Sequence, residues 1–339
     1  MDSRERLQRL MAGEAADRCG FWLGNPHADT WPIYHRHFGT TTPEELRVRL
    51  GDDFRWFCPQ FEPGVYQAPD RSSLWGPFVE GSAGGAPPLL AQCETPEEVY
   101  RLPWPNPDYL HFDSTLAALR AAGPYYRAGG FWTCFFHELM DFFGMETYFI
   151  RMYTHPEVVQ AATECMGRFY YTANVRFFEA AGRDMDAFFF GNDFGTQLDV
   201  MVSPEAFDTF ILPWFRRFTD LGHQFGYRVI LHSCGAIRKV IGRLIEAGVD
   251  ALHPLQARAA GMEAERLSRE FGGRLCWIGG VDTQELLVRG TPDQIREEVR
   301  RLRPLFGPRW IVSPSHEALL PNVPPENVAA MAEAARELA

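Results

Sequence analysis

The sequence predicts a (β/α)₈ barrel, an α/β fold in which eight parallel strands alternate with helices over about 250 residues. The first observation is a series of short, continuous apolar runs followed by helical patterns, which is typical of strands buried on both faces of a parallel sheet. The second is the chain length of 339 residues, which accommodates a barrel with an insertion. A doubly wound sheet would show the same alternation of elements. The expected strands are residues 20–23, 126–131, 185–190, 227–231, 249–252, 274–278 and 309–312.

Helix starts are marked clearly along the chain. Thr42, Thr95 and Thr291 are each followed by Pro and, three residues after the Thr, by Glu or Gln. This pattern predicts a capping box with proline in the first turn, where no backbone donor is needed. Ser203 precedes a proline in the same way, and residues 237–245 carry apolar side chains at helical spacing. These helices separate the expected strands.

The domain organisation predicted for residues 1–339 is a single barrel domain. Residues 52–108 are rich in Pro, Trp and Gly. Such a composition favours turns and irregular structure over long helices or strands. We therefore expect 52–108 to be an irregular insertion or subdomain of the barrel.

Composition and charge exclude several classes of function. Lys and Arg total 33 against 44 Asp and Glu, a net charge of −11, which does not suit a nucleic-acid partner. No apolar run approaches the ~20 residues that cross a bilayer, and no signal peptide is recognisable, so we expect a cytoplasmic protein with no membrane partner. The odd number of cysteines, seven, predicts free thiols or metal ligands. The sequence does not determine the oligomeric state.

Polar side chains follow most of the expected strands. In a β/α barrel the active site is built at the carboxyl ends of the strands, so these side chains are expected on one rim. Those expected there are Asn25, Asp193, His232, His253, Asp282 and His316. Four nearby polar residues, His27, His137, Gln197 and Gln256, are expected with Asn25 to bind substrate.

A metal site is predicted at the end of the strand 227–231. His232 and Cys234 are two residues apart, so in an extended segment both side chains reach one ion, and zinc prefers such nitrogen and sulfur ligands. Taken alone, such a pair is more often a buried histidine and a small buried thiol, but His253 and His316 at other strand ends favour the metal site, because a metal needs three or four converging ligands. His316 is the expected third ligand and His253 the reserve ligand, with water or substrate in the fourth position.

Catalytic roles are expected for Asp193, His253 and Asp282. Asp193 lies in a glycine-flanked polar loop, which favours an acid–base or substrate-anchoring role. Asp282 could instead cap the helix that follows it. Asp282 and Glu317 are also candidates to orient the histidine ligands.

Aromatic residues predict an apolar pocket wall. The chain contains 27 Phe, 11 Tyr and 9 Trp, more than a core of this size needs. Trp22, Phe131, Trp132 and Phe135 lie near early strand ends and are expected to line the pocket. The alternative is that these rings belong to the core and that the segment around His137, Glu138 and Asp141 is a buried helix.

Several motifs together resemble the uroporphyrinogen decarboxylase superfamily, and more narrowly its cobalamin-dependent methyltransferase branch. The resemblance is clearest from about residue 188 to 328 and is weaker over the first 180 residues. The motifs are Asn192-Asp193-Phe194-Gly195-Thr196-Gln197, Ser203-Pro204, His232-Ser233-Cys234-Gly235, Glu246-Ala247-Gly248-Val249-Asp250, Gly279-Gly280-Val281-Asp282-Thr283-Gln284, Pro314-Ser315-His316 and Val323-Pro324-Pro325-Glu326-Asn327.

The resemblance implies a (β/α)₈ barrel, a zinc ion held by His232 and Cys234, and a corrinoid (cobalamin) carried by a separate protein. This sequence departs from the family in two places. His316 stands where the methyltransferases have a late cysteine, and no arginine occurs between Arg18 and Arg36, where the decarboxylases have an arginine-rich loop. A porphyrinogen with several carboxylates needs such arginines, so decarboxylation of a tetrapyrrole is not expected.

The expected function is zinc-dependent transfer of a methyl group between a small substrate, methoxylated or aromatic, or a thiol, and a corrinoid. Two other functions stay open. One is a metal-dependent decarboxylase or lyase acting on a small carboxylic acid. The other is a non-catalytic barrel that binds a small molecule. Neither the methyl donor or acceptor nor the direction of transfer follows from the sequence.

Overall fold

Eight parallel strands form one sheet, which curves into a nearly closed barrel. The computed structural model describes residues 1–80, 87–316 and 318–337. The strand order is β1-β8-β7-β6-β5-β4-β3-β2. The strands are β1 (Gly20–Phe21), β2 (Phe54–Phe57), β3 (Tyr126–Gly129), β4 (Ala187–Gly191), β5 (Arg228–His232), β6 (Ala251–His253), β7 (Cys276–Val281) and β8 (Trp310–Pro314). This confirms the predicted (β/α)₈ barrel.

Buried aspartates join the two ends of this strand order. The backbone N–H of Asp53 donates to the carbonyl of Phe21 over 2.8 Å, and the Asp53 carboxylate accepts from the Phe21 N–H over 3.0 Å. Asp52 accepts from the N–H of Leu23 over 3.1 Å. Arg6 and Arg18 pair with the Asp53 carboxylate. A backbone hydrogen bond and the carboxylates of Asp52 and Asp53 therefore complete the closure between β1 and β2.

The strand β2 was not among the expected strands. It falls inside 52–108, the segment expected to be irregular, and it has only four residues, including Arg55. A short strand with a charged residue gives no continuous apolar run, so the pattern was not recognised. After β2, the described part of this segment has only helices of three to five residues: η1 (Pro59–Phe61), α4 (Gly76–Glu80), η3 (Leu90–Gln92), α5 (Pro96–Tyr100) and η4 (Pro107–Tyr109).

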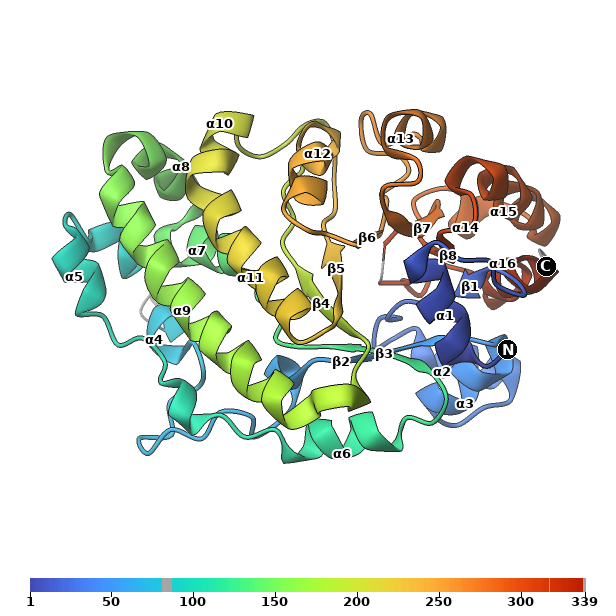
Figure 1. The fold of residues 1–339 in the computed structure, drawn as a ribbon, viewed down its shortest axis with the longest axis horizontal. Helices are drawn as coiled ribbons and strands as arrows, with labels where there is room; N and C mark the ends of the chain where they lie inside the picture. The colour runs from blue at the N-terminus through green and yellow to red at the C-terminus, as the bar shows by residue number, and fades with distance from the viewer. Residues whose placement is uncertain (81–86, 317, 338–339) are drawn as a thin grey trace.

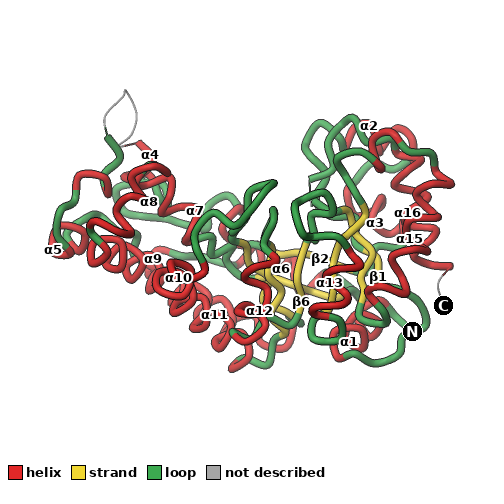
Figure 2. Tube along the Cα trace, turned by 90° about the horizontal axis from the view of Figure 1, so that it is seen from above, coloured by secondary structure: helices red, strands yellow, loops and turns green. Residues whose placement is uncertain are grey.

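Helices surround the strands, as Figures 1 and 2 show. Thr42, Thr95 and Thr291 form the predicted capping boxes of α3 (Pro43–Leu50), α5 and α15 (Pro292–Phe306). The long helices α9 (Pro156–Ala181) and α11 (Leu212–Gln224) lie side by side, and α4, α5 and α8 (Met145–Thr154) extend away from the barrel. The other helices are α1 (Ser3–Ala12), α2 (Trp31–Phe38), α6 (Asp113–Ala121), α7 (Phe135–Phe143), η5 (Gly182–Asp184), α10 (Pro204–Ala206), η6 (Phe207–Ile211), α12 (Arg238–Glu246), α13 (Ala264–Phe271), α14 (Leu286–Arg289) and α16 (Pro325–Glu337). Within residues 1–80, 87–316 and 318–337, no helix is both long and apolar enough to cross a membrane.

The barrel interior is filled by alternate residues of the strands. Phe54, Phe189 and Ile230 belong to this interior cluster, and Trp22 packs against Phe54 with ring centroids 4.7 Å apart. Successive strand residues point to opposite faces, so the remaining apolar strand residues face the helices and form a second core. Gly191 belongs to β4, and a Cβ there would lie 2.1 Å from the ring of Trp132. The absence of a side chain at residue 191 thus makes room for that ring.

Candidate metal centre

Three potential metal ligands meet at the carboxyl ends of β4 and β5. The Nε2 atom of His232 lies 3.4 Å from the sulfur of Cys234 and 3.3 Å from Oδ1 of Asp193. One ligand atom from each of these residues lies within 4.8 Å of the others. Gly191 pairs with His232 in the parallel register, which brings the loop after β4 beside the end of β5. The geometry therefore provides one nitrogen, one sulfur and one oxygen donor to a common point.

The Asp193 carboxylate is held in its charged form by its neighbours. Burial by itself would raise the pKa of Asp193, but the hydrogen bond and charge of His232 hold that pKa well below its usual range. The N–H of Cys234 also donates to Oδ1 of Asp193 over 2.7 Å. His137, on α7, contributes to the same lowering of the pKa, which puts it within electrostatic reach of Asp193. Asp193 therefore holds the His232–Cys234 segment in place.

The other ring nitrogen of His232 faces His253, at the end of the neighbouring strand β6. Their Nδ1 atoms are 2.9 Å apart, so one of the two must carry the hydrogen. Burial, together with His232 and His316, lowers the pKa of His253 well below its usual range, so this imidazole is neutral. If His232 Nδ1–H donates to His253, the lone pair of His232 Nε2 faces the side of Cys234 and Asp193, where it can bind a metal. His253, expected as a catalytic residue or reserve ligand, is thus placed to orient His232.

His316 lies outside the three-residue group. Its Nδ1 atom accepts a hydrogen bond from the N–H of Ala318 over 3.1 Å. Its side chain lines a cavity of about 420 Å³, shared with Gln256, Thr283 and other residues. His316 follows the carboxyl end of β8, two residues after Pro314, and its charge acts on His253. Its role as a ligand stays a prediction, and the expected support from Glu317 lies outside the described residues.

Asp193 belongs to the group of potential metal ligands. The sequence had instead suggested an acid–base or substrate-anchoring role for this residue. The signal that could have found it is topological. Consecutive strands of a barrel are neighbours, so a carboxylate following β4 stands beside a histidine ending β5. Carboxylate oxygen is also an accepted zinc ligand.

Asp282 caps the helix that follows it, which is the alternative role that the sequence offered for this residue. Its carboxylate accepts from the N–H groups of Gln284 over 2.9 Å and Leu286 over 3.2 Å. Arg258 approaches the same carboxylate at 3.5 Å. These contacts hold the start of α14, and a catalytic role for Asp282 stays a prediction.

The polar residues expected to bind substrate have different surroundings. Gln256 accepts from the Gly235 N–H over 2.8 Å and donates to Oε1 of Gln197 over 2.7 Å, so it fixes the turn after Cys234. Asn25 accepts from Arg47 over 3.3 Å. His27 is half exposed, and its Nδ1 lies 3.4 Å from the carboxylate of Asp29.

The four aromatic residues expected in the pocket wall divide into two pairs. Trp22 and Trp132 face the barrel interior, where Trp22 packs on His253 at 4.7 Å and Trp132 on His232 at 5.3 Å between ring centroids.

Phe131 and Phe135 instead lie in the core between strands and helices. Phe131 packs on Phe112, and Phe135 packs on Phe218 of α11. Their side chains point away from the barrel interior, so the pocket-wall expectation is corrected for this pair.

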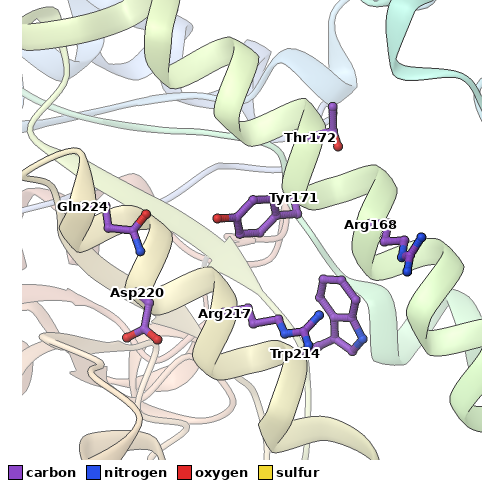
Figure 3. A pocket seen from close by; sticks show the side chains of 7 residues that line it. All are labelled: Arg168, Tyr171, Thr172, Trp214, Arg217, Asp220 and Gln224. Atoms are coloured by element: carbon purple, nitrogen blue, oxygen red, sulfur yellow. The ribbon is translucent and has the colours of Figure 1, made fainter.

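A separate cavity of about 520 Å³ lies on the outer face of the helices, away from the strand ends (Figure 3). It lies between α9 and α11, and the guanidinium of Arg217 stacks on the ring of Trp214 at 4.4 Å. Its lining residues are Arg168, Tyr171, Thr172, Trp214, Arg217, Asp220 and Gln224. None of the expected site residues lines it.

The protein is a β/α barrel with polar residues at the carboxyl ends of its strands, and three of these residues form a candidate metal centre. The family model described as Uroporphyrinogen decarboxylase (URO-D) matches residues 79–338, more than half of the chain. The chain therefore belongs to the uroporphyrinogen decarboxylase family. No curated protein sequence matches it closely enough to count as a relative. Among solved structures, a methyltransferase from Methanosarcina mazei is similar over 99% of both chains, with a TM-score of 0.68 and 16% identity. A likeness at this identity concerns the fold.

Proposed function

We propose that this protein is a zinc-dependent methyltransferase that moves a methyl group between a small substrate and a corrinoid carried by a separate protein. One observation carries the proposal. His232, Cys234 and Asp193 converge at the rim of a barrel of the uroporphyrinogen decarboxylase family. The similar fold of a protein named as a methyltransferase supports the transferase branch of the family.

The donor set fits zinc. A neutral imidazole nitrogen, a thiolate sulfur and a carboxylate oxygen suit zinc, whereas magnesium and calcium prefer oxygen ligands alone. His232, Cys234 and Asp193 would hold the ion, with His316 as a further candidate. A zinc ion bound there supplies Lewis-acid chemistry, either polarising an ether or hydroxyl oxygen or lowering the pKa of a thiol.

The protein's own residues prepare this site. His253 orients the His232 ring through the contact between their Nδ1 atoms. Asp193 and Gln256 fix the backbone on either side of the Cys234–Gly235 bond by accepting the N–H groups of these two residues. Trp132 covers one side of the His232 ring and limits the access of water. Rigid support of this kind keeps ligands aligned during a reaction.

The surroundings favour an apolar or aromatic methyl donor. Trp132 and Trp56 lie in edge-to-face contact at 5.2 Å, and both are only partly buried, so their rings offer an apolar surface at the barrel mouth. A methoxylated aromatic compound matches this surface. Arg18, the arginine nearest to the first strand, is bound to the Asp53 carboxylate, which argues against a clamp for a polycarboxylate.

Decarboxylation of a small carboxylic acid is the second candidate, because the matching family model carries a decarboxylase name. Methyl transfer and decarboxylation differ in their products. The test incubates the protein with free cob(I)alamin and a panel of methoxylated aromatic compounds, and follows methylcobalamin by absorbance. Methylcobalamin formation supports the proposal. If the protein releases CO₂ from carboxylic acids and forms no methylcobalamin, the methyltransferase proposal is wrong and the protein is a decarboxylase.

The matched variants in this test are Cys234→Ser and Cys165→Ser. Cys234 belongs to the ligand group, whereas Cys165 lies on α9, away from the strand ends. We expect methyl transfer to be lost in the first variant and kept in the second. Equal activity in both variants would exclude the proposed centre.

A further inference from the structure

A second polar cluster stands at the ends of β2 and β3, and the proposed chemistry does not use it. Gln60 lies in η1, directly after β2, while Glu138 lies in the first turns of α7, after β3. Tyr170, from α9, completes the group. Gln60 and Glu138 follow the carboxyl ends of their strands and so lie at the same rim of the barrel as the candidate metal centre. Tyr170 contacts both of them from α9. We call these three residues the Glu138 cluster.

The hydrogen bonds within the Glu138 cluster leave acceptors in excess. The Tyr170 hydroxyl donates to Oε2 of Glu138 over 2.6 Å, and Nε2 of Gln60 donates to Oε1 of Glu138 over 3.2 Å. Nε2 of Gln60 also donates to the Tyr170 oxygen over 3.1 Å. Because Nε2 of Gln60 faces two oxygens, one from Glu138 and one from Tyr170, the orientation of the Gln60 amide is fixed. Oε1 of Gln60 is consequently buried with no donor among the described residues.

The charge of the Glu138 cluster is also unbalanced. No Lys, Arg or His of residues 1–80, 87–316 and 318–337 forms an ion pair with Glu138. The titratable groups that act on its carboxyl are Tyr170 and Cys134, which hydrogen-bond to it, and Asp141, whose negative charge repels it. A buried carboxylate without a cation carries a desolvation cost. A cationic ligand would offset this cost.

An apolar surface connects the Glu138 cluster to the metal centre. The N–H groups of Gln60 and Trp132 both point to the sulfur of Cys58, which ties the loop after β2 to the end of β3. The Trp132 ring in turn packs on His232. Trp56, Gln60, Trp132, Cys134 and Glu138 are all only partly buried, as expected for side chains around an open mouth. A ligand with an aromatic body can therefore contact both polar groups.

We propose that Gln60, Glu138 and Tyr170 form a subsite for the protonated amino group of a small ligand. An ammonium group donates hydrogen bonds to the Gln60 oxygen and the Glu138 carboxylate, and it neutralises the carboxylate charge. A hydroxyl group can donate only one of these hydrogen bonds and does not neutralise the charge, whereas a quaternary ammonium offers charge but no donor. In the proposed methyltransferase, on which this reading of the ligand rests, the methyl donor is an aromatic ether that carries an amine.

The test compares binding of 4-methoxybenzylamine and 4-methoxybenzyl alcohol by calorimetry at pH 8. We expect the wild-type protein to bind the amine about tenfold more tightly than the alcohol, or about 1.4 kcal/mol. Glu138→Gln should remove this preference, and Gln60→Leu should reduce it. The control Glu146→Gln changes an exposed carboxylate in the first turn of α8, which is not among the groups that act on Glu138, and it should keep the preference.

Equal binding of the two compounds to the wild-type protein would overturn the inference, as would failure to bind the amine or an unchanged preference in Glu138→Gln. Gln60→Leu serves as the test if Glu138→Gln does not fold. The subsite and the proposed function fail separately. Amine preference without methylcobalamin formation contradicts only the methyltransferase, and methyl transfer from neutral ethers without amine preference contradicts only the subsite.

Discussion

His232 and His253 face each other through their Nδ1 atoms at 2.9 Å, at the ends of two adjacent strands. When neutral His253 accepts a hydrogen bond from His232 Nδ1–H, this contact fixes the tautomer of the candidate ligand. The Nε2 atom of His232 is then unprotonated on the side of Cys234 and Asp193. The relationship explains why a buried histidine stands beneath the proposed centre.

Replacing His253 should therefore weaken zinc binding without removing a ligand. We expect His253→Leu, which has no acceptor, to lower zinc affinity about 10–100-fold. His253→Asn places an oxygen near the position of Nδ1 and should recover much of that affinity. Chelator competition measures both values. Equal affinities in the Leu variant and the wild type would show that the contact does not orient His232.

Gly191→Ala should destabilise the protein through Trp132. A Cβ at residue 191 would lie 2.1 Å from the Trp132 ring, so the ring must move. Overpacking of this kind costs about 1–3 kcal/mol of the free energy of unfolding, which urea titration measures.

The control is Gly242→Ala in α12, where an added Cβ meets nothing within 4 Å. Alanine is favoured over glycine in a helix, so this variant should be as stable as the wild type or more stable. Equal destabilisation in the two variants would contradict the packing of Trp132 against Gly191.

Glu138 should make stability depend on pH in a defined direction. Burial raises the pKa of Glu138 to about 7 from an ordinary value of 4.5. Between these values the folded protein holds a proton that the unfolded chain has released. The contribution of Glu138 to stability is therefore fully present below pH 4.5 and is lost as the pH rises through 7.

The measurement compares the wild type with Glu138→Gln in urea unfolding at a series of pH values. The free energy of unfolding of the wild type, minus that of the variant, should fall from about pH 4.5 to 7. Groups other than Glu138 largely cancel in this difference. A flat or rising difference would show that Glu138 titrates near its ordinary pKa.

The sequence predicted the barrel because most of its strands are continuous apolar runs with polar residues at their ends. It missed β2, whose four residues include a buried arginine paired with Asp52 and Glu44, a pattern that local hydrophobicity does not reveal. The orientation of Phe131 and Phe135 was also inaccessible, since nearness to a strand end does not say which face a ring takes.

The pair His232 and Cys234 could be found from spacing alone, because two residues in an extended segment share a direction. The third member of the group could not. Asp193 is 39 residues from His232 in the chain, and only the pairing of β4 with β5 brings them together. The Glu138 cluster depends in the same way on α7, α9 and η1 packing together.

The most direct test of the account is the zinc content of purified protein, measured by elemental analysis after growth with zinc. We expect about one zinc ion per wild-type chain, because three donors converge there. Cys234→Ser and Asp193→Asn should lose most of this zinc while remaining folded by circular dichroism, and Cys165→Ser should keep it. Equal zinc in the Cys234→Ser variant and the wild type, or no zinc in the wild type, would contradict the proposed centre.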